Sequence, residues 1–308
     1  MAKKSIILAL DYGGTKHTAA VAAIGGREWL AHERIFSPPG ADAQYDKKAM
    51  LKLARKLLKK AGGKLIAVGV SFGGAVDGEN GLVLLSHHVP GWENTPLRDQ
   101  LQKEFLVPAA VGNDAQVAGL GEYQFGAGRG FSSMLYVTVS TGIGGGWILD
   151  GKIFHGANGM AGQIGHVVVR PNGALCVCGK RGCLEAEACG PGIALKMRTR
   201  KKSQASAKLT GEIVAKAALQ GDPLAQEVMD DAATMLGIGL GGAITLMNPQ
   251  RVVLGGGVTK SGERWWRIVR ETARARVLPE MRVDIQPAAL GDDAPLWGAV
   301  ALAEDLIQ

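Results

Sequence analysis

The sequence predicts an α/β protein of two domains, and two patterns support this prediction. Short apolar runs that fit buried strands alternate with longer segments of helical periodicity, as is typical of α/β folds. The length of 308 residues is enough for two domains of ordinary size. A second series of strands, beginning at Met134–Ser140, resembles the opening of the chain, which indicates that the two halves are related units.

The first half opens with two strands that flank a glycine turn. Ser5–Leu10 reads as a buried strand, Asp11–Lys16 as the turn and Thr18–Ile24 as a returning strand. A helix with apolar residues on one face and basic residues on the other follows at residues 45–61, and Gly62-Gly63 ends it. The remaining elements of this half are strands at Leu65–Ser71 and Ala109–Gly112 and helices at Leu97–Glu104 and Ala115–Tyr123.

The second half contains a strand pair, a loop and several helices. Met134–Ser140 and Gly145–Leu149 read as strands joined by a glycine-rich turn, and Pro171–Cys183 lacks periodicity and is predicted to be a loop. The remaining elements are helices at Gly211–Leu219, Pro223–Leu246, Glu263–Arg276 and Pro295–Leu306, and strands at Arg251–Leu254 and Val283–Gln286.

Charge and hydropathy argue against several function classes. The formal charge of +7 is mildly basic, and the basic residues gather in Lys47–Lys60 and Lys196–Lys208 without a nucleic-acid-reading motif. We therefore expect no nucleic-acid partner; solvated helix faces are the simpler interpretation, although Lys196–Lys208 could also be an interface. Asp11 interrupts the first apolar run too early for a secretory signal, and Met235–Met247 is too short to span a membrane. We expect a cytoplasmic protein without a membrane partner.

Glycine makes up 45 of the 308 residues and gathers in three turns that each follow a strand-like run. The turns are Asp11–Lys16, Thr141–Gly146 and Leu254–Val258. Bare backbone N–H groups at such turns can approach phosphate oxygens, and a carboxylate such as Asp11 could help to hold Mg²⁺. A simple hairpin turn is the alternative for any one of them. Three together favour a nucleotide site.

The common phosphate-binding motifs do not explain these turns. The sequence contains no G-x-x-x-x-G-K-[ST] segment. Gly237–Gly242 matches G-x-G-x-x-G, but it lies inside a helical pattern with no strand before it. We therefore predict close helix packing at Gly237–Gly242 rather than a dinucleotide site.

Asp114 follows the apolar run that ends at Gly112 and directly precedes a helical pattern. The free N–H groups and the dipole at a helix start favour the ionised form of a carboxylate. An ionised carboxylate is what a general base needs when an alcohol attacks a phosphoryl group. An ordinary helix cap is the alternative for an isolated Asp, but the neighbouring motifs favour the base.

The most specific local signal is the set of Cys176, Cys178 and Cys183, with His166 upstream. Three thiolates and an imidazole are the ligand set of a closed structural zinc site, which we expect to fix a loop rather than to take part in the chemistry. Such clustering in a chain with no other cysteines than Cys189 also favours a reducing compartment. Cys189 itself is predicted to be a small buried hydrophobic residue.

Glu185 lies two residues beyond Cys183, so the loop would carry it into the same pocket as His166. A carboxylate and an imidazole that are held rigidly suit a polyhydroxylated ligand. For Glu185 and Gln163 taken alone, an ordinary surface position is the alternative.

These motifs together resemble the ROK family (repressors, open reading frames and sugar kinases) over essentially the whole chain. The matching segments are residues 8–16, 112–115, 141–146, 161–166 and 176–185. The resemblance implies a two-domain actin-like ATPase (ribonuclease H-like) sugar kinase fold with a structural zinc loop, usually as a homodimer or homotetramer. The N-terminal α/β domain is expected over residues 1–118, completed by the last helix at about 295–308, and the larger C-terminal α/β domain, which carries the zinc loop, over 119–294.

The resemblance also implies ATP-dependent phosphorylation of a hexose, with ATP, Mg²⁺ and Zn²⁺ as cofactors. Asp114 would take the proton of the sugar 6-hydroxyl. The implied sugar contacts are Gly74, Asn113, Asp114, Gln163, His166 and Glu185. The implied contacts to ATP and its Mg²⁺ are Asp11, Gly13, Gly14, Thr15, Lys16, Thr141, Gly142, Gly256 and Gly257. The implied zinc ligands are His166, Cys176, Cys178 and Cys183.

Two departures from the family pattern fall in the implied sugar pocket. Gln163 stands where the family usually has Glu, and Phe72–Ala75 replaces a Pro-Gly-Pro turn. Glucose is the first expected substrate, with N-acetylmannosamine, N-acetylglucosamine, fructose and allose as alternatives. The non-catalytic alternatives are a sugar-responsive repressor and a binding protein without turnover. Repressors of the family carry a DNA-binding segment before the first phosphate motif, whereas Asp11 lies near the start of this chain.

Overall fold

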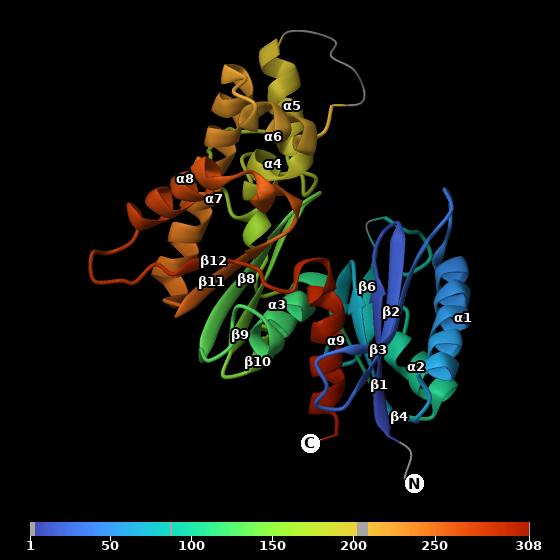
Figure 1. Ribbon diagram of the computed structural model, residues 1–308. Coiled ribbons are helices and arrows are strands. Elements are labelled where there is room, and N and C mark those ends of the chain that lie inside the picture. Colours follow the sequence, from blue (N-terminus) through green and yellow to red (C-terminus); the bar gives the residue numbers. More distant parts are fainter. Residues whose placement is uncertain (1–3, 87, 202–208, 308) are drawn as a thin grey trace. The chain divides into compact units, whose positions relative to one another are not determined.

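The computed structural model describes residues 4–86, 88–201 and 209–307. Within these residues the protein forms two five-stranded sheets and a small two-stranded sheet, with helices between the strands, so the predicted α/β class is confirmed (Figure 1). The contacts within the chain define two compact units. Unit 1 comprises Met1–Gly130, Gly146–Ala161 and Ala289–Gln308, and unit 2 comprises Phe131–Gly145 and Gly162–Ala288.

The first sheet has the strand order β3-β2-β1-β4-β7. Its strands are β1 (Ser5–Tyr12), β2 (Lys16–Ala23), β3 (Trp29–Phe36), β4 (Lys64–Phe72) and β7 (Ala109–Asn113). The pairs β1–β2 and β2–β3 are antiparallel, whereas β4 runs parallel to both β1 and β7. The carboxyl ends of β1, β4 and β7 therefore lie at one edge of this sheet. A small hairpin of β5 (Ala75–Asp77) and β6 (Leu82–Leu85) follows β4.

Both faces of the first sheet are buried under helices. Along β1, Ile6 and Leu8 belong to one hydrophobic core, and Ile7 and Ala9 belong to another, as the alternation of a strand requires. The first core includes residues of α1 (Ala43–Ala61) and α2 (Leu97–Phe105), and the second includes residues of α3 (Asp114–Phe125) and α9 (Ala294–Asp305). Figure 1 shows α1 and α9 on opposite sides of this sheet. The strand ends are thus held in a rigid frame.

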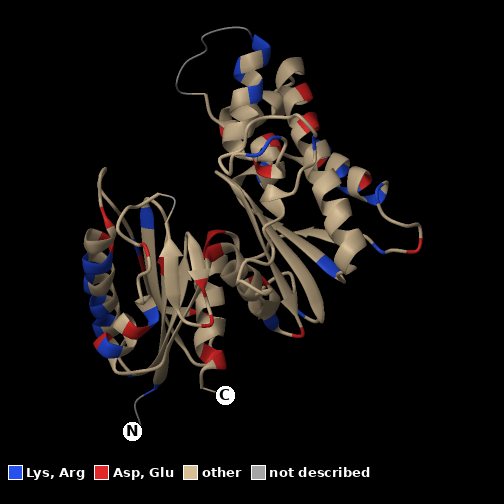
Figure 2. Ribbon diagram, turned by 180° about the vertical axis from the view of Figure 1, so that it is seen from behind, with Lys and Arg blue, Asp and Glu red and all other residues tan. Residues whose placement is uncertain are grey.

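Helix α1 matches its sequence prediction closely. Asp42 accepts a hydrogen bond from the Tyr45 N–H at the helix start, and Gly62 ends the helix with φ of 67°, a conformation that favours glycine. Its apolar residues are buried, whereas its lysines and arginines lie along the side away from the sheet (Figure 2). This basic segment is a solvated helix face.

Helices α3 and α9 approach each other through glycines. A Cβ atom at Gly298 would lie 1.8 Å from the carbonyl oxygen of Val117, and one at Gly121 would lie 2.4 Å from that of Ala294. Neither position therefore accepts a side chain unless the helices separate. The helix that begins at Asp114 is consequently fixed by the last helix of the chain.

The second sheet has the strand order β10-β9-β8-β11-β12. Its strands are β8 (Ser133–Val139), β9 (Ile143–Leu149), β10 (Lys152–Phe154), β11 (Arg251–Gly255) and β12 (Ile285–Pro287). Strand β11 runs parallel to β8 and β12, and β10 is antiparallel to β9. Its order repeats that of the first sheet, as the repeated sequence pattern predicted.

The helices of unit 2 include the one that contains Gly237–Gly242. They are α4 (Leu184–Ala188), α5 (Gly190–Lys201), α6 (Gly211–Leu219), α7 (Pro223–Met247) and α8 (Glu263–Arg274). A Cβ atom at Gly237 in α7 would lie 2.5 Å from the Cβ atom of Thr272 in α8. The prediction of close helix packing at this glycine motif is confirmed.

Strand β3 and helix α5 are among the elements that escaped the sequence analysis. Strand β3 has a mixed burial pattern in which charged residues are only partly exposed, so its alternation is weak. Helix α5 begins with Gly190-Pro191-Gly192, residues that usually mark turns, although proline is tolerated in the first turn of a helix. Of the basic segment Lys196–Lys208, the part up to Lys201 lies in α5, and residues 202–208 lie outside the described residues. No helix in the described part of the chain combines the length and the apolar character needed to cross a bilayer.

Candidate functional site

The carboxyl edge of the first sheet gathers polar side chains from three neighbouring strands. Asp11 of β1 is paired in register with Ser71 of β4, and Phe72 of β4 is paired with Asn113 of β7. Asp114 follows Asn113 as the first residue of α3. The sheet thus brings Asp11, Asn113 and Asp114, three of the predicted site residues, to one edge.

Asp11 is held by a neighbour that the sequence analysis did not single out. The Ser71 hydroxyl donates a hydrogen bond of 2.8 Å to Asp11 Oδ1. Burial raises the pKa of Asp11 to about 6, and the charge of Asp114 adds to this rise, although Ser71 and Lys16 act in the opposite direction. Ser71 is the last residue of the predicted strand Leu65–Ser71. Its place at a strand end, like that of Asp11, could have identified it as a partner of Asp11.

At the start of α3, the helix cap and the candidate base are two different residues. The Asn113 side-chain oxygen accepts from the N–H groups of Ala115 and Gln116, so Asn113 is the N-cap. Asp114 Oδ1 accepts from the Ala115 N–H at 2.8 Å and from Asn113 Nδ2 at 3.0 Å. The alternative interpretation of Asp114 as the helix cap is therefore wrong.

Two opposing effects set the ionisation of Asp114. Burial raises the pKa of Asp114 to about 6, although the hydrogen bonds from Ala115 and Asn113 lower it. The helix start does favour the ionised form, as the sequence analysis expected, but the loss of water outweighs it. A carboxyl group with this pKa is mostly ionised at neutral pH and remains basic enough to accept a proton.

The segment after β4 is packed against Asn113 and Asp114. Asn113 Nδ2 donates to the carbonyl oxygen of Gly74 at 2.9 Å, and the Gly73 N–H donates to the Tyr12 carbonyl at 2.8 Å. A Cβ atom at Gly73 would lie 3.7 Å from Asp114 Oδ2. Glycine at position 73 therefore keeps one side of the Asp114 carboxylate open.

The glycine turn between β1 and β2 is tight and partly open to solvent. The Gly13 N–H donates to the Lys16 carbonyl at 3.1 Å, which closes the turn. A Cβ atom at Gly14 would lie 2.9 Å from the Cβ atom of His88, so only glycine fits without movement. Thr15 is exposed at the tip. The turn leaves backbone groups accessible at the same edge as Asp11.

The second sheet carries two glycine turns at its corresponding edge. Residues 140–142 follow β8, and Gly256 follows β11, which is parallel to β8. Gly256 has φ of 90°, and a Cβ atom there would lie 2.4 Å from the Val139 carbonyl oxygen. This close approach brings the turn that contains Thr141 and Gly142 next to the turn that contains Gly256 and Gly257.

Glu185 of α4 supports the first of these turns. Its Oε2 atom accepts a hydrogen bond of 2.9 Å from the Ile143 N–H, and a Cβ atom at Gly142 would lie 2.7 Å from the same oxygen. The sequence analysis placed Glu185 at a sugar and did not anticipate this contact. Gln163, by contrast, is exposed before a short 3-10 helix (Ile164–His166) and makes no capping hydrogen bond.

The four predicted metal ligands come together in unit 2. The donor atoms of His166, Cys176, Cys178 and Cys183 all lie within 4.8 Å of one another. Cys176 Sγ is 3.7 Å from His166 Nδ1, and Cys178 Sγ is 3.6 Å from Cys183 Sγ. Sulfur ligands about 2.3 Å from a tetrahedral centre lie roughly 3.8 Å apart. The donor set and its spacing therefore fit zinc, with the Nε2 atom of His166 left for another partner.

Cys189 lies outside this cluster. It is buried at the end of α4, and its Sγ atom accepts from the Gly192 N–H at 3.4 Å. The prediction of a buried, non-ligand cysteine is thus confirmed.

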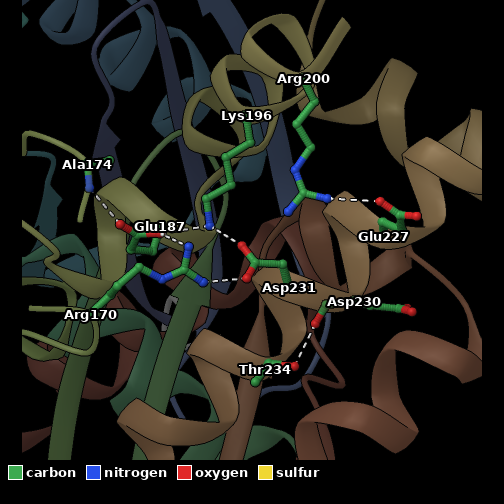
Figure 3. Close-up of polar contacts among 9 residues, drawn as sticks. All are labelled: Arg170, Ala174, Glu187, Lys196, Arg200, Glu227, Asp230, Asp231 and Thr234. Carbon is green, nitrogen blue, oxygen red and sulfur yellow. Dashed lines mark hydrogen bonds and ion pairs between the residues drawn. The ribbon is translucent and has the colours of Figure 1, made fainter. Parts of the chain in front are cut away.

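A buried carboxylate braces the cysteine loop from behind. Glu187 of α4 accepts from the Ala174 N–H at 2.7 Å and forms an ion pair with Lys196 of α5 at 2.8 Å. Arg170 and Lys196 both contact Asp231 of α7, so the loop is tied to two helices (Figure 3). Burial opposes the ionisation of Glu187, but Lys196 and the Ala174 N–H outweigh it and lower the pKa of this carboxyl group. The sequence analysis missed this network, because none of its members forms a motif.

Comparison with known proteins gives one family over nearly the whole chain. The family model described as "ROK family" matches residues 7–306. A glucokinase from Halalkalibacterium halodurans is 38% identical over 78% of this chain and 76% of its own length. A glucokinase from Thermotoga maritima is 32% identical over 98% of both chains. Other matched relatives are named N-acetylmannosamine kinase and xylose repressor.

The solved structures agree with this result. A ROK family glucokinase from Streptomyces griseus, in complex with glucose and AMPPNP, has a TM-score of 0.80 and 31% sequence identity. The match covers 97% of this chain and 99% of the Streptomyces chain.

Proposed function

Since this chain belongs to the ROK family, we propose that it is an ATP-dependent sugar kinase that phosphorylates the 6-hydroxyl of a hexose, with glucose as the first candidate substrate. Relatives that are named glucokinase and match it over most of their length support the kinase assignment. The observation that carries the mechanism is the Asp114 carboxylate. It lies at a helix start, and it has a pKa of about 6.

In the proposed reaction, Asp114 accepts the proton of the attacking hydroxyl while the hydroxyl oxygen bonds to the γ-phosphorus of ATP, and the bond from this phosphorus to the bridging oxygen breaks so that ADP leaves. A base in this position must be ionised before the reaction and must bind a proton afterwards, and a pKa slightly below neutral serves both needs. Asn113 holds Asp114 Oδ1 at 3.0 Å and so fixes the direction of the carboxylate.

The proposed phosphate contacts are the backbone groups of two glycine turns. In unit 1 these are Gly13, Gly14 and Thr15, with Lys16 as a nearby positive charge and Asp11 as a carboxylate for Mg²⁺. In unit 2 they are Thr141 and Gly142, and Gly256 and Gly257 are assigned to the adenosine. Mg²⁺ would neutralise charge on the transferred phosphoryl group.

The proposed sugar contacts are Gly74, Asn113, Asp114, Gln163, His166 and Glu185. A structural zinc ion held by His166 Nδ1 and the three thiolates would fix the imidazole, so that its Nε2 atom is oriented towards a sugar hydroxyl. We further propose a cytoplasmic homodimer or homotetramer, which gel filtration with light scattering would test.

The decisive experiment is an ADP-release assay over a panel of hexoses that includes glucose, N-acetylmannosamine, N-acetylglucosamine, fructose and allose. We expect turnover with glucose and a loss of roughly 10²- to 10⁴-fold in Asp114→Ala, the range for removal of a general base. Calorimetry should show that the variant still binds glucose. Unchanged turnover in Asp114→Ala would remove Asp114 from the mechanism.

The same panel tests the alternative substrates. A higher kcat/KM with N-acetylmannosamine than with glucose would favour the kinase named for that sugar among the relatives. Absence of ADP release with every sugar, together with salt-sensitive and sequence-selective DNA binding, would instead favour a regulator.

A further inference from the structure

Three polar side chains form a buried cluster beside the glycine turn of unit 1. His17 of β2 and Asp46 of α1 are each 1% exposed, and His17 Nε2 lies 2.8 Å from Asp46 Oδ1. The Ser37 hydroxyl, just after β3, lies 2.8 Å from His17 Nε2 and donates to Asp46 Oδ1 at 2.7 Å. Three separate elements therefore meet at one carboxylate oxygen.

The geometry excludes a nucleophilic triad. In such a triad the carboxylate bonds one ring nitrogen of the histidine and the serine bonds the other. Here Ser37 and Asp46 both approach Nε2 of His17, and the Ser37 proton goes to the carboxylate. His17 Nδ1 has no hydrogen-bond partner among the described residues. Nothing in this arrangement activates the Ser37 oxygen.

The cluster is connected directly to the turn. His17 follows Lys16, the residue whose carbonyl oxygen closes the turn by accepting from the Gly13 N–H. The Ser37 N–H donates to the Thr15 carbonyl oxygen at 3.0 Å. Ser37 therefore holds the turn with its backbone and the cluster with its hydroxyl. The part of the turn that leads into β2 is therefore connected to the end of β3 through Ser37 and to α1 through Asp46.

The inner side of the cluster is packed against an aromatic group. The Tyr12 ring lies edge-on to His17, with ring centroids 5.6 Å apart, and it also packs against Trp92 at 5.4 Å. Tyr12 lies between Asp11 and Gly13 in sequence, so this contact supports the first leg of the turn. His17 therefore supports both legs of the turn: it contacts the Tyr12 ring before the turn, and it directly follows Lys16 at the end of the turn.

Hydrophobic packing alone does not explain why polar residues occupy these buried positions. Asp46 Oδ2 and His17 Nδ1 are buried without hydrogen-bond partners in the described part of the chain. Buried polar groups with unsatisfied atoms are destabilising, and apolar residues of similar volume often replace such clusters at no loss. What apolar residues cannot supply is a directional bond that fixes one conformation of the adjoining turn.

We propose that His17, Ser37 and Asp46 are positioning residues that hold the turn Gly13–Lys16 in the conformation that receives the phosphates of ATP. This inference rests on the proposed function, because it assigns the turn to the nucleotide. None of the three side chains touches substrate in this proposal; they act through the Thr15 and Lys16 backbone. The affected quantity is therefore the affinity for nucleotide, and the affinity for sugar stays unchanged.

The test compares Ser37→Ala, His17→Leu and His17→Gln with a matched control, Val21→Ala. Val21 is fully buried in the same strand as His17, belongs to the core that contains Tyr12 and is paired with Leu8 and Ala31 on the neighbouring strands. Calorimetric binding of Mg²⁺-AMPPNP and the KM values for ATP and glucose are measured for each variant. Hydrogen exchange of the peptide that covers Gly13–Ser37 reports on the turn itself.

We expect Ser37→Ala and His17→Leu to weaken AMPPNP binding and to raise KM for ATP roughly fivefold, the effect of one lost hydrogen bond. The KM for glucose should stay unchanged, and exchange of the Ser37 amide should accelerate. Gln at position 17 keeps a donor at a similar reach, so it should restore most of the affinity. Val21→Ala should lower the melting temperature without changing KM for ATP.

Two results would overturn the inference. If Ser37→Ala and His17→Leu lose stability but match Val21→Ala in nucleotide affinity, the cluster only packs the core. If KM for glucose rises as much as KM for ATP, its role is not specific to the turn. If the wild-type protein neither binds AMPPNP nor releases ADP, the proposed function is refuted, and the inference with it. The wild-type measurement alone distinguishes this outcome from the two results above.

Discussion

In each of the two five-stranded sheets, three strands joined by glycine turns or tight turns are followed by two further strands that run parallel to the first of them. Strand β1 corresponds to β8, β4 to β11 and β7 to β12 in this order. Both sheets keep a glycine turn after their first strand. Only the first sheet has an acid directly after its last parallel strand, because Asn113 ends β7 and Asp114 follows it, whereas Ala288 and Ala289 follow β12.

This difference suggests that the glycine turns serve a task common to both sheets, phosphate binding, whereas the acid after β7 serves a task of the first sheet alone, proton transfer. Glycine turns at both edges suit phosphate, which any bare backbone can approach. The Asp114 carboxylate suits proton transfer, which only one of the two edges needs. Unit 2 has the cysteine loop and α4 instead, and through them the Glu185 contact to its turn. The predictions below test this division.

The largest effect is expected for Asp114→Asn. This change keeps the shape of the side chain but removes the base, so kcat should fall by roughly 10²- to 10⁴-fold. Burial raises the pKa of Asp114 from 3.8 to about 6 in the folded protein, so ionisation of this group destabilises the fold progressively as the pH rises from about 4 to about 6, and in full above pH 6. Thermal unfolding should therefore show Asp114→Asn to be at least as stable as the wild type at pH 8. A large loss of stability at pH 8 would contradict the assignment of the burial cost to this carboxylate.

Removal of one cysteine of the proposed zinc site should mainly lower the stability of the protein. Cys183→Ser removes a fully buried thiol of the proposed zinc site, so we expect the protein to purify without stoichiometric zinc and to melt several degrees lower, as structural zinc contributes folding energy. Elemental analysis and calorimetric melting measure the two results. Cys189→Ser is the matched control, because this buried cysteine lies outside the cluster. Equal zinc content in both variants would rule out the proposed site.

The pH dependence of kcat/KM should follow the ionisation of the unit 1 edge. Asp114 and Asp11 both have pKa values raised to about 6 by burial, and each must be ionised for its proposed role. Activity should therefore fall about tenfold or more per pH unit below this range and be flat above it. Steady-state rates between pH 5 and pH 8 measure this. A profile that stays flat down to pH 5 would contradict the raised pKa values.

The smallest effect is expected at the unit 2 edge. Glu185→Ala removes the acceptor for the Ile143 N–H, so AMPPNP binding in the absence of sugar should weaken roughly fivefold. Gln163→Ala is the control, since Gln163 is exposed and is assigned to the sugar alone. If Glu185→Ala changes only glucose affinity, its contact to the turn has no role in nucleotide binding.

Much of this arrangement was predictable because local signals agree with it. The end of α1 at Gly62, the turn after β1 and the cysteine cluster each depend on residues close in sequence. The raised pKa of Asp114 was not predictable, because the balance between burial and hydrogen bonds depends on the whole surrounding packing. The contact between Glu185 and Ile143 joins residues that are distant in sequence, and no motif announces it.

The glycine contacts between α3 and α9 have a consequence for synthesis of the protein on the ribosome. Gly298 and Ala294 belong to the last helix, yet they pack directly against Val117 and Gly121, just beyond Asp114. A nascent chain that has not yet reached α9 leaves the apolar side of α3 without the packing partners that α9 supplies. The helix that begins with the proposed base Asp114 is therefore packed only after α9 has been synthesised.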